Sequence, residues 1–250
     1  MLHRSTLKTD QGDLIYTLSS SPEVKNGPAV LYFALSGERT LYEEPFNQPA
    51  VALANQGVHL FSWDLPFHTP NAEPQEALNK WMQAFQTGSP LSANFVALSK
   101  QNLTFLNQFY GVCSENLAVM GLSRGGYMAT QLAAAMPAIK WLLGFAPLTS
   151  PLAQEKVSAS LFSEISLSAL ASKLTSKQLR FYIGNDDTKV GTDSCFSFIH
   201  HLSKTAHLQG VRSPQVELII SPSIGHKGHG TAPEIFANGA AWLQKQLFTP

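Results

Sequence analysis

The sequence predicts an α/β fold: a mostly parallel, twisted sheet of about eight strands with helices on both faces. Short apolar runs that resemble buried strands alternate with helix-like segments along the whole chain. The length of 250 residues fits one large domain better than two small ones. No internal repeat, low-complexity tract or linker interrupts the pattern. We therefore expect a single domain over residues 1–250.

The first part of the chain predicts a hairpin followed by alternating strands and helices. The turn residues at 10–13 separate two strand-like segments, which is typical of a hairpin. A proline stands near the start of the first predicted helix, and Gly57 follows its end. The predicted elements are strands at 2–8, 13–18, 29–35 and 58–63 and a helix at 46–56.

The remaining chain continues the alternation after a polar connection at 67–89. Trp81, Met82 and Phe85 recur there at helical spacing, which favours packing against the core over covering a pocket. A small flap over the site is expected from 67–89 or from 151–178. The predicted elements are helices near 74–86, 92–110 and 232–247 and strands at 117–120, 140–146, 179–184 and 215–221.

Composition excludes several classes of function. Lys plus Arg and Asp plus Glu both number 17, so we expect no nucleic-acid partner. The N-terminus lacks the apolar core of a signal peptide, and no apolar stretch approaches a membrane span of about 18 residues. These features predict a cytoplasmic protein without a membrane partner. Cys113 and Cys195 lack C-x-x-C spacing, so we expect two buried thiols and neither a disulfide nor a zinc site.

The most informative segment is Gly-Leu-Ser-Arg-Gly-Gly at residues 121–126. It lies between the strand-like run 117–120 and a helix-like run, the context in which a G-x-S-x-G pattern indicates a nucleophile elbow. A serine on so sharp a turn needs neighbours without a Cβ, a role that Gly121 and Gly125 fill. Ser123 is therefore the candidate nucleophile. The backbone N–H of Arg124, at the start of the helix, is a candidate oxyanion donor.

A candidate acid follows a later predicted strand. The loop after the strand at 179–183 contains Asp186 and Asp187. A carboxylate there would orient a histidine and stabilise the imidazolium that forms during acyl transfer. We favour Asp187, with Asp186 as the alternative. A role for both only in shaping an Asx-type turn remains open.

Two histidines follow the last predicted strand, and both qualify as the general base, because the ordinary pKa of histidine lies near neutrality. We favour His226, whose distance from the strand suits a loop that returns over the sheet edge. His229 is closer to the final helix, where it would cap or pack. No third His or Cys and no carboxylate cluster stands nearby, so a metal site is disfavoured.

The chain order Ser123, Asp187, His226 is that of the α/β-hydrolases among enzymes with a serine triad. The chain resembles the α/β-hydrolase superfamily from about residue 12 to 247. The G-x-S-x-G-G-Y-M segment is similar to elbows of its prolyl-oligopeptidase-like and dienelactone-hydrolase-like branches. The acid segment from Gly184 to Val190, and the Gly-His pair that ends at His226, match as well.

The resemblance has two departures. The segment Asp-Leu-Pro-Phe-His at 64–68 is similar to the D-x-P-G-H segment of the superfamily, with Phe67 in place of the glycine; His68 would be structural. Ser36-Gly37-Glu38 replaces the usual His-Gly that supplies the second oxyanion donor. A backbone N–H does not depend on the side chain, so the resemblance implies Glu38 as donor, with Gly37 as the alternative.

The expected function is a serine hydrolase, without cofactor or metal, that cleaves carboxylic esters of small or medium acyl groups through an acyl-enzyme. Its partner would be a small-molecule ester. A peptidase or thioesterase would use the same triad on a different pocket. The rival from another class is a catalytically silent binding protein on the same fold. A serine at position 123 argues against the dehalogenases and epoxide hydrolases of this fold, which use an aspartate.

Overall fold

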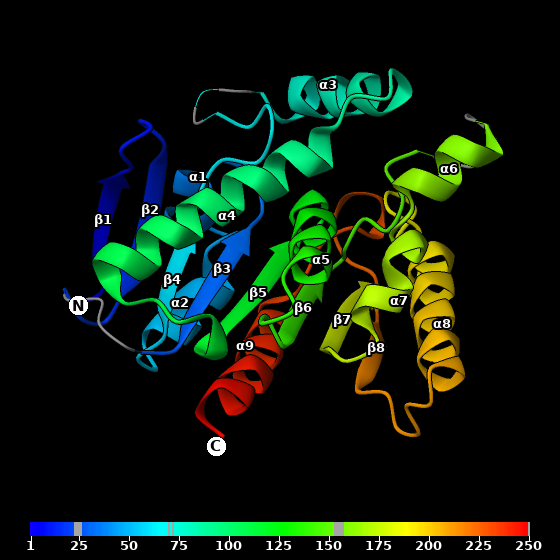
Figure 1. Ribbon diagram of the computed structural model, residues 1–250. Coiled ribbons are helices and arrows are strands. Elements are labelled where there is room, and N and C mark those ends of the chain that lie inside the picture. Colours follow the sequence, from blue (N-terminus) through cyan, green and yellow to red (C-terminus); the bar gives the residue numbers. More distant parts are fainter. Residues whose placement is uncertain (23–26, 70, 72, 153–157, 250) are drawn as a thin grey trace.

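The computed structural model describes residues 1–22, 27–69, 71, 73–152 and 158–249. In this part of the chain one sheet contains eight strands in the order β1-β2-β4-β3-β5-β6-β7-β8 (Figure 1). The strands are β1 (His3–Lys8), β2 (Leu14–Ser19), β3 (Ala29–Phe33), β4 (His59–Ser62), β5 (Leu117–Leu122), β6 (Trp141–Phe145), β7 (Gln178–Gly184) and β8 (Val216–Ser221).

The sheet is antiparallel at one edge and parallel elsewhere. β1 pairs with β2 and β2 with β4 in antiparallel register, whereas β4, β3, β5, β6, β7 and β8 run parallel. The N–H of Gly12 donates to the carbonyl of Thr9 and closes the β1–β2 hairpin. The predicted fold class is confirmed, and every predicted strand lies within about two residues of an observed one.

Helices cover both faces of the sheet. Figure 1 shows α4 and α5 in front of the strands, and α2 and α9 behind them. Helices α1 and α8 were absent from the sequence-based expectation, and α6 and α7 lie in the segment 151–178, which was expected only as a small flap. The helices are α1 (Gly37–Tyr42), α2 (Gln48–Ala54), α3 (Pro74–Gln86), α4 (Leu91–Tyr110), α5 (Arg124–Ala135), α6 (Ala159–Ile165), α7 (Ala171–Leu174), α8 (Thr192–Leu208) and α9 (Pro233–Phe248), with 3-10 turns η1 (Ser114–Asn116), η3 (Leu167–Leu170) and η4 (His226–Gly228).

The central strands send alternate side chains to two separate cores. In β3, Leu31 and Phe33 join the core beneath α4, α5 and α8, whereas Val30 and Tyr32 join the core beneath α2 and α9. All four side chains are fully buried. A strand buried on both faces forms a continuous apolar run in the sequence, which explains why such runs located these strands.

Helix α3 belongs to the core. Trp81 is 1% exposed, its ring packs edge-on against Phe85 and Tyr127, and its indole N–H donates to the carbonyl of Pro66 over 2.8 Å. The expectation of a core stripe is therefore confirmed for Trp81 and Phe85. A flap role for 67–89 or 151–178 remains a prediction, and residues 70, 72 and 153–157 of these segments lie outside the described chain.

Two further expectations concern cysteines and membranes. Cys195 is buried as expected, but Cys113 is exposed, because it precedes the 3-10 turn η1 on a surface connection. The expectation of two buried thiols is therefore wrong for Cys113. Among the described residues, no helix combines the length and apolarity needed to cross a bilayer.

Candidate functional site

Ser123 lies on a strained turn between β5 and α5. Its φ of 56° and ψ of −118° fall in a region that residues with a Cβ rarely adopt, at a cost of about 1–3 kcal/mol. Backbone hydrogen bonds hold it there. Its N–H donates to Phe145 over 2.9 Å, and its carbonyl accepts from Leu148 and Gly126, each over 3.0 Å. The turn is therefore fixed by the connection that follows the neighbouring strand, β6.

The glycines of the elbow are required by close backbone approach. A Cβ on Gly121 would lie 2.3 Å from the carbonyl carbon of Gly125, and one on Gly125 would lie 1.8 Å from the carbonyl oxygen of Phe33. A Cβ on Gly126 would lie 2.7 Å from Pro147. The interpretation of the G-x-S-x-G segment as a tight strand-to-helix elbow is supported at each of these positions.

The carboxylate of Asp187 is buried at the carboxyl end of β7. Its Oδ1 accepts the backbone N–H groups of Lys189 and Val190 over 3.0 and 3.1 Å, so the residue also shapes its own turn. Burial raises the pKa of Asp187, but the bonds from His229 and from these two amides outweigh it and hold the pKa below its usual value. Asp186 is exposed, and its N–H donates to Ser223.

The loop after β8 doubles back on itself. Gly225, Lys227 and Gly228 all have positive φ, of 72°, 55° and 70°. The loop also packs tightly against the Asp187 loop, because a Cβ on Gly228 would lie 2.1 Å from the carbonyl oxygen of Asp186. This reversal leaves His226 exposed at the tip and brings His229 back toward the sheet.

Ser123, His229 and Asp187 form a continuous hydrogen-bonded chain. His229 Nε2 lies 2.9 Å from Ser123 Oγ, and His229 Nδ1 lies 2.7 Å from Asp187 Oδ2. An ionised carboxylate only accepts, so Nδ1 carries the imidazole proton and the Nε2 lone pair faces the serine hydroxyl. The side chain of His229 is 11% exposed and that of Asp187 is fully buried.

The histidine that sequence reasoning favoured is not the one near Ser123. The structure brings Ser123 and Asp187 together as expected, but it places His229 between them and leaves His226 on the exposed 3-10 turn η4. Loop length and the match of the Gly225-His226 pair to the superfamily pattern suggested His226. The three positive φ values reverse the chain within the loop, so the residue three positions later reaches the serine.

The backbone N–H groups of Arg124 and Glu38 have no hydrogen-bond partner within the described part of the chain. Both stand in the first turn of a helix, where such donors are free. The N–H of Gly37 donates to Asp64 Oδ1 over 2.8 Å, and that of Arg39 donates to the capping side chain of Ser36. Of the two alternatives after β3, Glu38 therefore keeps a free donor and Gly37 does not.

His68 is buried and neutral. It is 3% exposed, and its Nδ1 donates to the carbonyl of Pro66 over 2.8 Å. Burial and the charge of Arg124 lower its pKa to about 4. His68 therefore already uses one ring nitrogen for the backbone and packs against Trp81, which agrees with the structural role that the resemblance implies.

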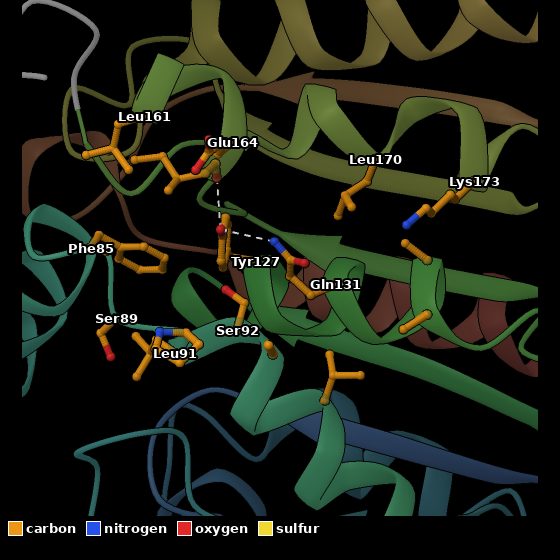
Figure 2. Close-up of a pocket in the computed structure, with 17 residues that line it drawn as sticks. Phe85, Ser89, Leu91, Ser92, Tyr127, Gln131, Leu161, Glu164, Leu170 and Lys173 are labelled. Carbon is orange, nitrogen blue, oxygen red and sulfur yellow. Dashed lines mark hydrogen bonds between the residues drawn. The ribbon is translucent and has the colours of Figure 1, made fainter. Parts of the chain in front are cut away.

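A separate cavity of about 410 Å³ lies on the side of α5, between the α3–α4 connection and α6 (Figure 2). Its lining includes Phe85, Leu91, Tyr127, Gln131 and Glu164, and none of Ser123, Asp187 and His229. Tyr127 Oη donates to the carbonyl of Ile165 over 2.8 Å and accepts from Gln131 over 3.0 Å.

The described residues contain no group of three or more His, Cys, Asp or Glu side chains arranged to hold a metal ion.

Comparison with solved structures shows an α/β-hydrolase fold over the whole chain. A protein from Thermus thermophilus is 16% identical and superposes with a TM-score of 0.75, covering 100% of both chains. A cold-adapted esterase from an Arctic intertidal metagenomic library is 20% identical, with a TM-score of 0.66 and coverage of 98% of this chain and 93% of the esterase. The Pyrococcus horikoshii acylaminoacyl peptidase is 14% identical, with a TM-score of 0.66 and coverage of 98% of this chain and 40% of the peptidase.

No protein-family model matches the chain, and no curated protein matches it in sequence. The likeness is therefore one of fold. The structural neighbours also include a putative dienelactone hydrolase from Klebsiella pneumoniae, which is 13% identical with a TM-score of 0.68, and the segment at 121–128 resembles elbows of the dienelactone-hydrolase-like and prolyl-oligopeptidase-like branches.

Proposed function

We propose that the protein is a serine hydrolase that cleaves carboxylic esters of small or medium acyl groups. The observation that carries the proposal is the hydrogen-bonded chain of Ser123, His229 and Asp187, with N···O distances of 2.9 and 2.7 Å. Nucleophile and base within hydrogen-bond reach, with the base oriented by a third group, is the arrangement that activates a serine.

In the proposed reaction, His229 Nε2 takes the proton of Ser123 as Oγ attacks the ester carbonyl. Asp187 stabilises the imidazolium that forms and remains ionised. The imidazolium then donates its proton to the leaving alkoxide. Water, activated by the same histidine, releases the acid from the acyl-enzyme and restores the serine.

The free N–H groups of Arg124 and Glu38 are the proposed oxyanion donors. Preorganised donors aimed at the developing negative charge are each worth about 10²–10³ in rate. The Arg124 N–H begins α5, so the positive end of that helix adds to the stabilisation. Gly37, the earlier alternative, is already engaged with Asp64 and does not enter the proposal.

The proposal of an ester substrate rests on the esterases among the structural neighbours, which are distant in sequence. Peptide or thioester cleavage on the same three residues is the nearest alternative, in keeping with the peptidase neighbour. A panel of p-nitrophenyl esters, peptide anilides and acyl thioesters separates the three. That the enzyme is cytoplasmic and independent of cofactors stays a prediction from the sequence.

The test compares the activities of variants at Ser123, His229 and His226. Ser123→Ala and His229→Ala are expected to lower kcat for p-nitrophenyl butyrate by about 10³-fold or more. His226→Ala is the matched control, since this side chain is exposed and is expected to retain activity. A fluorophosphonate probe should label Ser123 in the wild-type protein. A protein that the probe does not label would instead be the silent binding protein considered above.

A further inference from the structure

Arg124, the residue that follows the proposed nucleophile in sequence, carries a positive charge without a partner in the described part of the chain. Its Nη1 atom is buried and has no hydrogen-bond partner, and no described carboxylate forms an ion pair with the guanidinium. Burial lowers the pKa of Arg124 to about 10, so the group remains charged at neutral pH. Arg124 as a whole is half-buried, and a charge that is partly removed from water without a counter-ion is costly; an anionic ligand would reduce that cost.

The surrounding charges reinforce this one. Lys189 belongs to the loop of Asp187 and Lys227 to the loop of His229. The pKa of Lys189 is lowered by burial first, and then by the charges of Arg124 and Lys227, with Asp187 opposing them. The chain as a whole has no net charge, so the excess of positive charge here is local.

The nearby carboxylates have other partners. Asp187 is bonded to His229 and to two backbone amides, and Asp64 Oδ1 accepts the N–H of Gly37. Neither these groups nor Glu38 acts on the pKa of Arg124, for which burial is the cause. The pKa of His68 is lowered to about 4 by burial and by the charge of Arg124, so this side chain is neutral at pH 7 and offers no negative charge. The guanidinium therefore has no counter-ion within the described residues.

We propose that the Arg124 guanidinium binds a carboxylate on the substrate, so that the preferred substrates are esters carrying a free carboxylate, such as half-esters of dicarboxylic acids. The proposal rests on the hydrolase function proposed above and specifies its substrate class. A guanidinium matches a carboxylate with two parallel hydrogen bonds, and Arg124 is partly exposed and has no carboxylate partner of its own among the described residues. Because the backbone N–H of the same residue would hold the oxyanion, Arg124 couples recognition of the carboxylate to placement of the ester carbonyl.

The test compares a charged ester with its neutral isostere. Monoethyl adipate and the ethyl ester of adipic acid monoamide differ only in the carboxylate. The wild-type protein is expected to favour the carboxylate by about 10- to 100-fold in kcat/KM, the range for a hydrogen bond between charged groups. An acetyl ester of glycolate, compared with that of glycolamide, tests a carboxylate on the alcohol side.

The variants measure this ratio rather than total activity. Arg124→Gln keeps the backbone N–H and should bring the ratio near 1, mainly through a higher KM for the charged ester. Arg124→Lys should restore part of the preference. Arg212→Gln removes the same charge from an exposed position at the opposite end of β8 and should leave the ratio unchanged.

A second measurement keeps the proposal open to refutation if Arg124→Gln fails to fold. Adipate should slow fluorophosphonate labelling of wild-type Ser123 at lower concentration than adipamide does. If neutral esters are hydrolysed as well as charged ones, or if Arg124→Gln keeps the preference, the carboxylate proposal is wrong and the hydrolase function stands. If no ester is cleaved and Ser123 is not labelled, the hydrolase function fails, and this proposal with it.

Discussion

Replacing Gly125 by alanine should separate activity from overall folding, because this glycine sets the distance between α5 and β3. The new Cβ would lie 1.8 Å from the carbonyl oxygen of Phe33, whereas Cβ atoms essentially never lie closer than 3.0 Å to a neighbour. One of the two elements must therefore move by at least the difference, about 1.2 Å. Ser123 immediately precedes α5 and would move with it.

A shift of this size should break the contact on which the proposed chemistry depends. The distance from Ser123 Oγ to His229 Nε2 is 2.9 Å, so a displacement of about 1 Å takes it beyond hydrogen-bonding range. Misplacement on this scale costs about 10²-fold in rate, and overpacking costs about 1–3 kcal/mol of stability. The expected result is a folded but less stable protein whose fluorophosphonate labelling rate falls about 10²-fold.

The matched control is Gly210→Ala. Gly210 has a φ of +85°, and a Cβ there would meet nothing within 4 Å. Alanine at that position costs about 1–2 kcal/mol of backbone strain without displacing any element. Urea unfolding and labelling rates of both variants are compared with the wild type. Wild-type labelling by Gly125→Ala would refute the reasoning, as would an equal loss of activity in Gly210→Ala.

Three further predictions concern stability and thiol reactivity. Lys177 is 3% exposed, and its Nζ donates to the carbonyls of Met136, Pro137 and Ile139. Lys177→Met leaves these carbonyls without a donor and should lower the unfolding free energy by about 2–4 kcal/mol in urea titrations. The control Lys204→Met, at an exposed position, should change the unfolding free energy little. The pKa of Asp187 is lower in the folded protein than the value of about 3.9 expected in the unfolded chain. The ionised carboxylate therefore stabilises the fold at pH values above the unfolded pKa, and this stabilisation is lost as pH falls through the folded pKa. The unfolding free energy, measured between about pH 5 and 2.5, should fall less steeply in Asp187→Asn than in the wild type. Cys113 is exposed, whereas burial raises the pKa of Cys195 to about 12; a thiol reagent should therefore modify one cysteine per native chain, and Cys113→Ser should abolish that reaction.

The sequence predicted what depends on local composition. Continuous apolar runs located the central strands, because a strand buried on both faces leaves no polar positions. The pattern around Ser123 predicted the elbow, since Gly121 and Gly125 each lie where two backbone segments come too close for a Cβ. Asp187 was preferred to Asp186, and only Asp187 is buried and bonded to a histidine.

What escaped prediction depends on contacts between distant segments. The choice between His226 and His229 is decided by three positive φ values and by the packing of Gly228 against the carbonyl of Asp186, 42 positions earlier in sequence. Helix α1 has six residues, too few to show a period, and its side-chain cap comes from Ser36. The unpartnered charge of Arg124 could not be predicted either, because the numbers of acidic and basic residues in the whole chain are equal and say nothing about which charges are paired.

The backbone bonds of Ser123 have a consequence for the motions of the elbow. Its amide donates to Phe145, the last residue of β6, and its carbonyl accepts from Leu148 just beyond that strand. Breaking these bonds requires β5 to separate from β6 in the centre of the sheet. Amide hydrogens in such positions exchange with solvent only when the whole domain opens. The amide hydrogen of Ser123 should therefore be among the slowest to exchange, and the strained geometry should last as long as the fold itself.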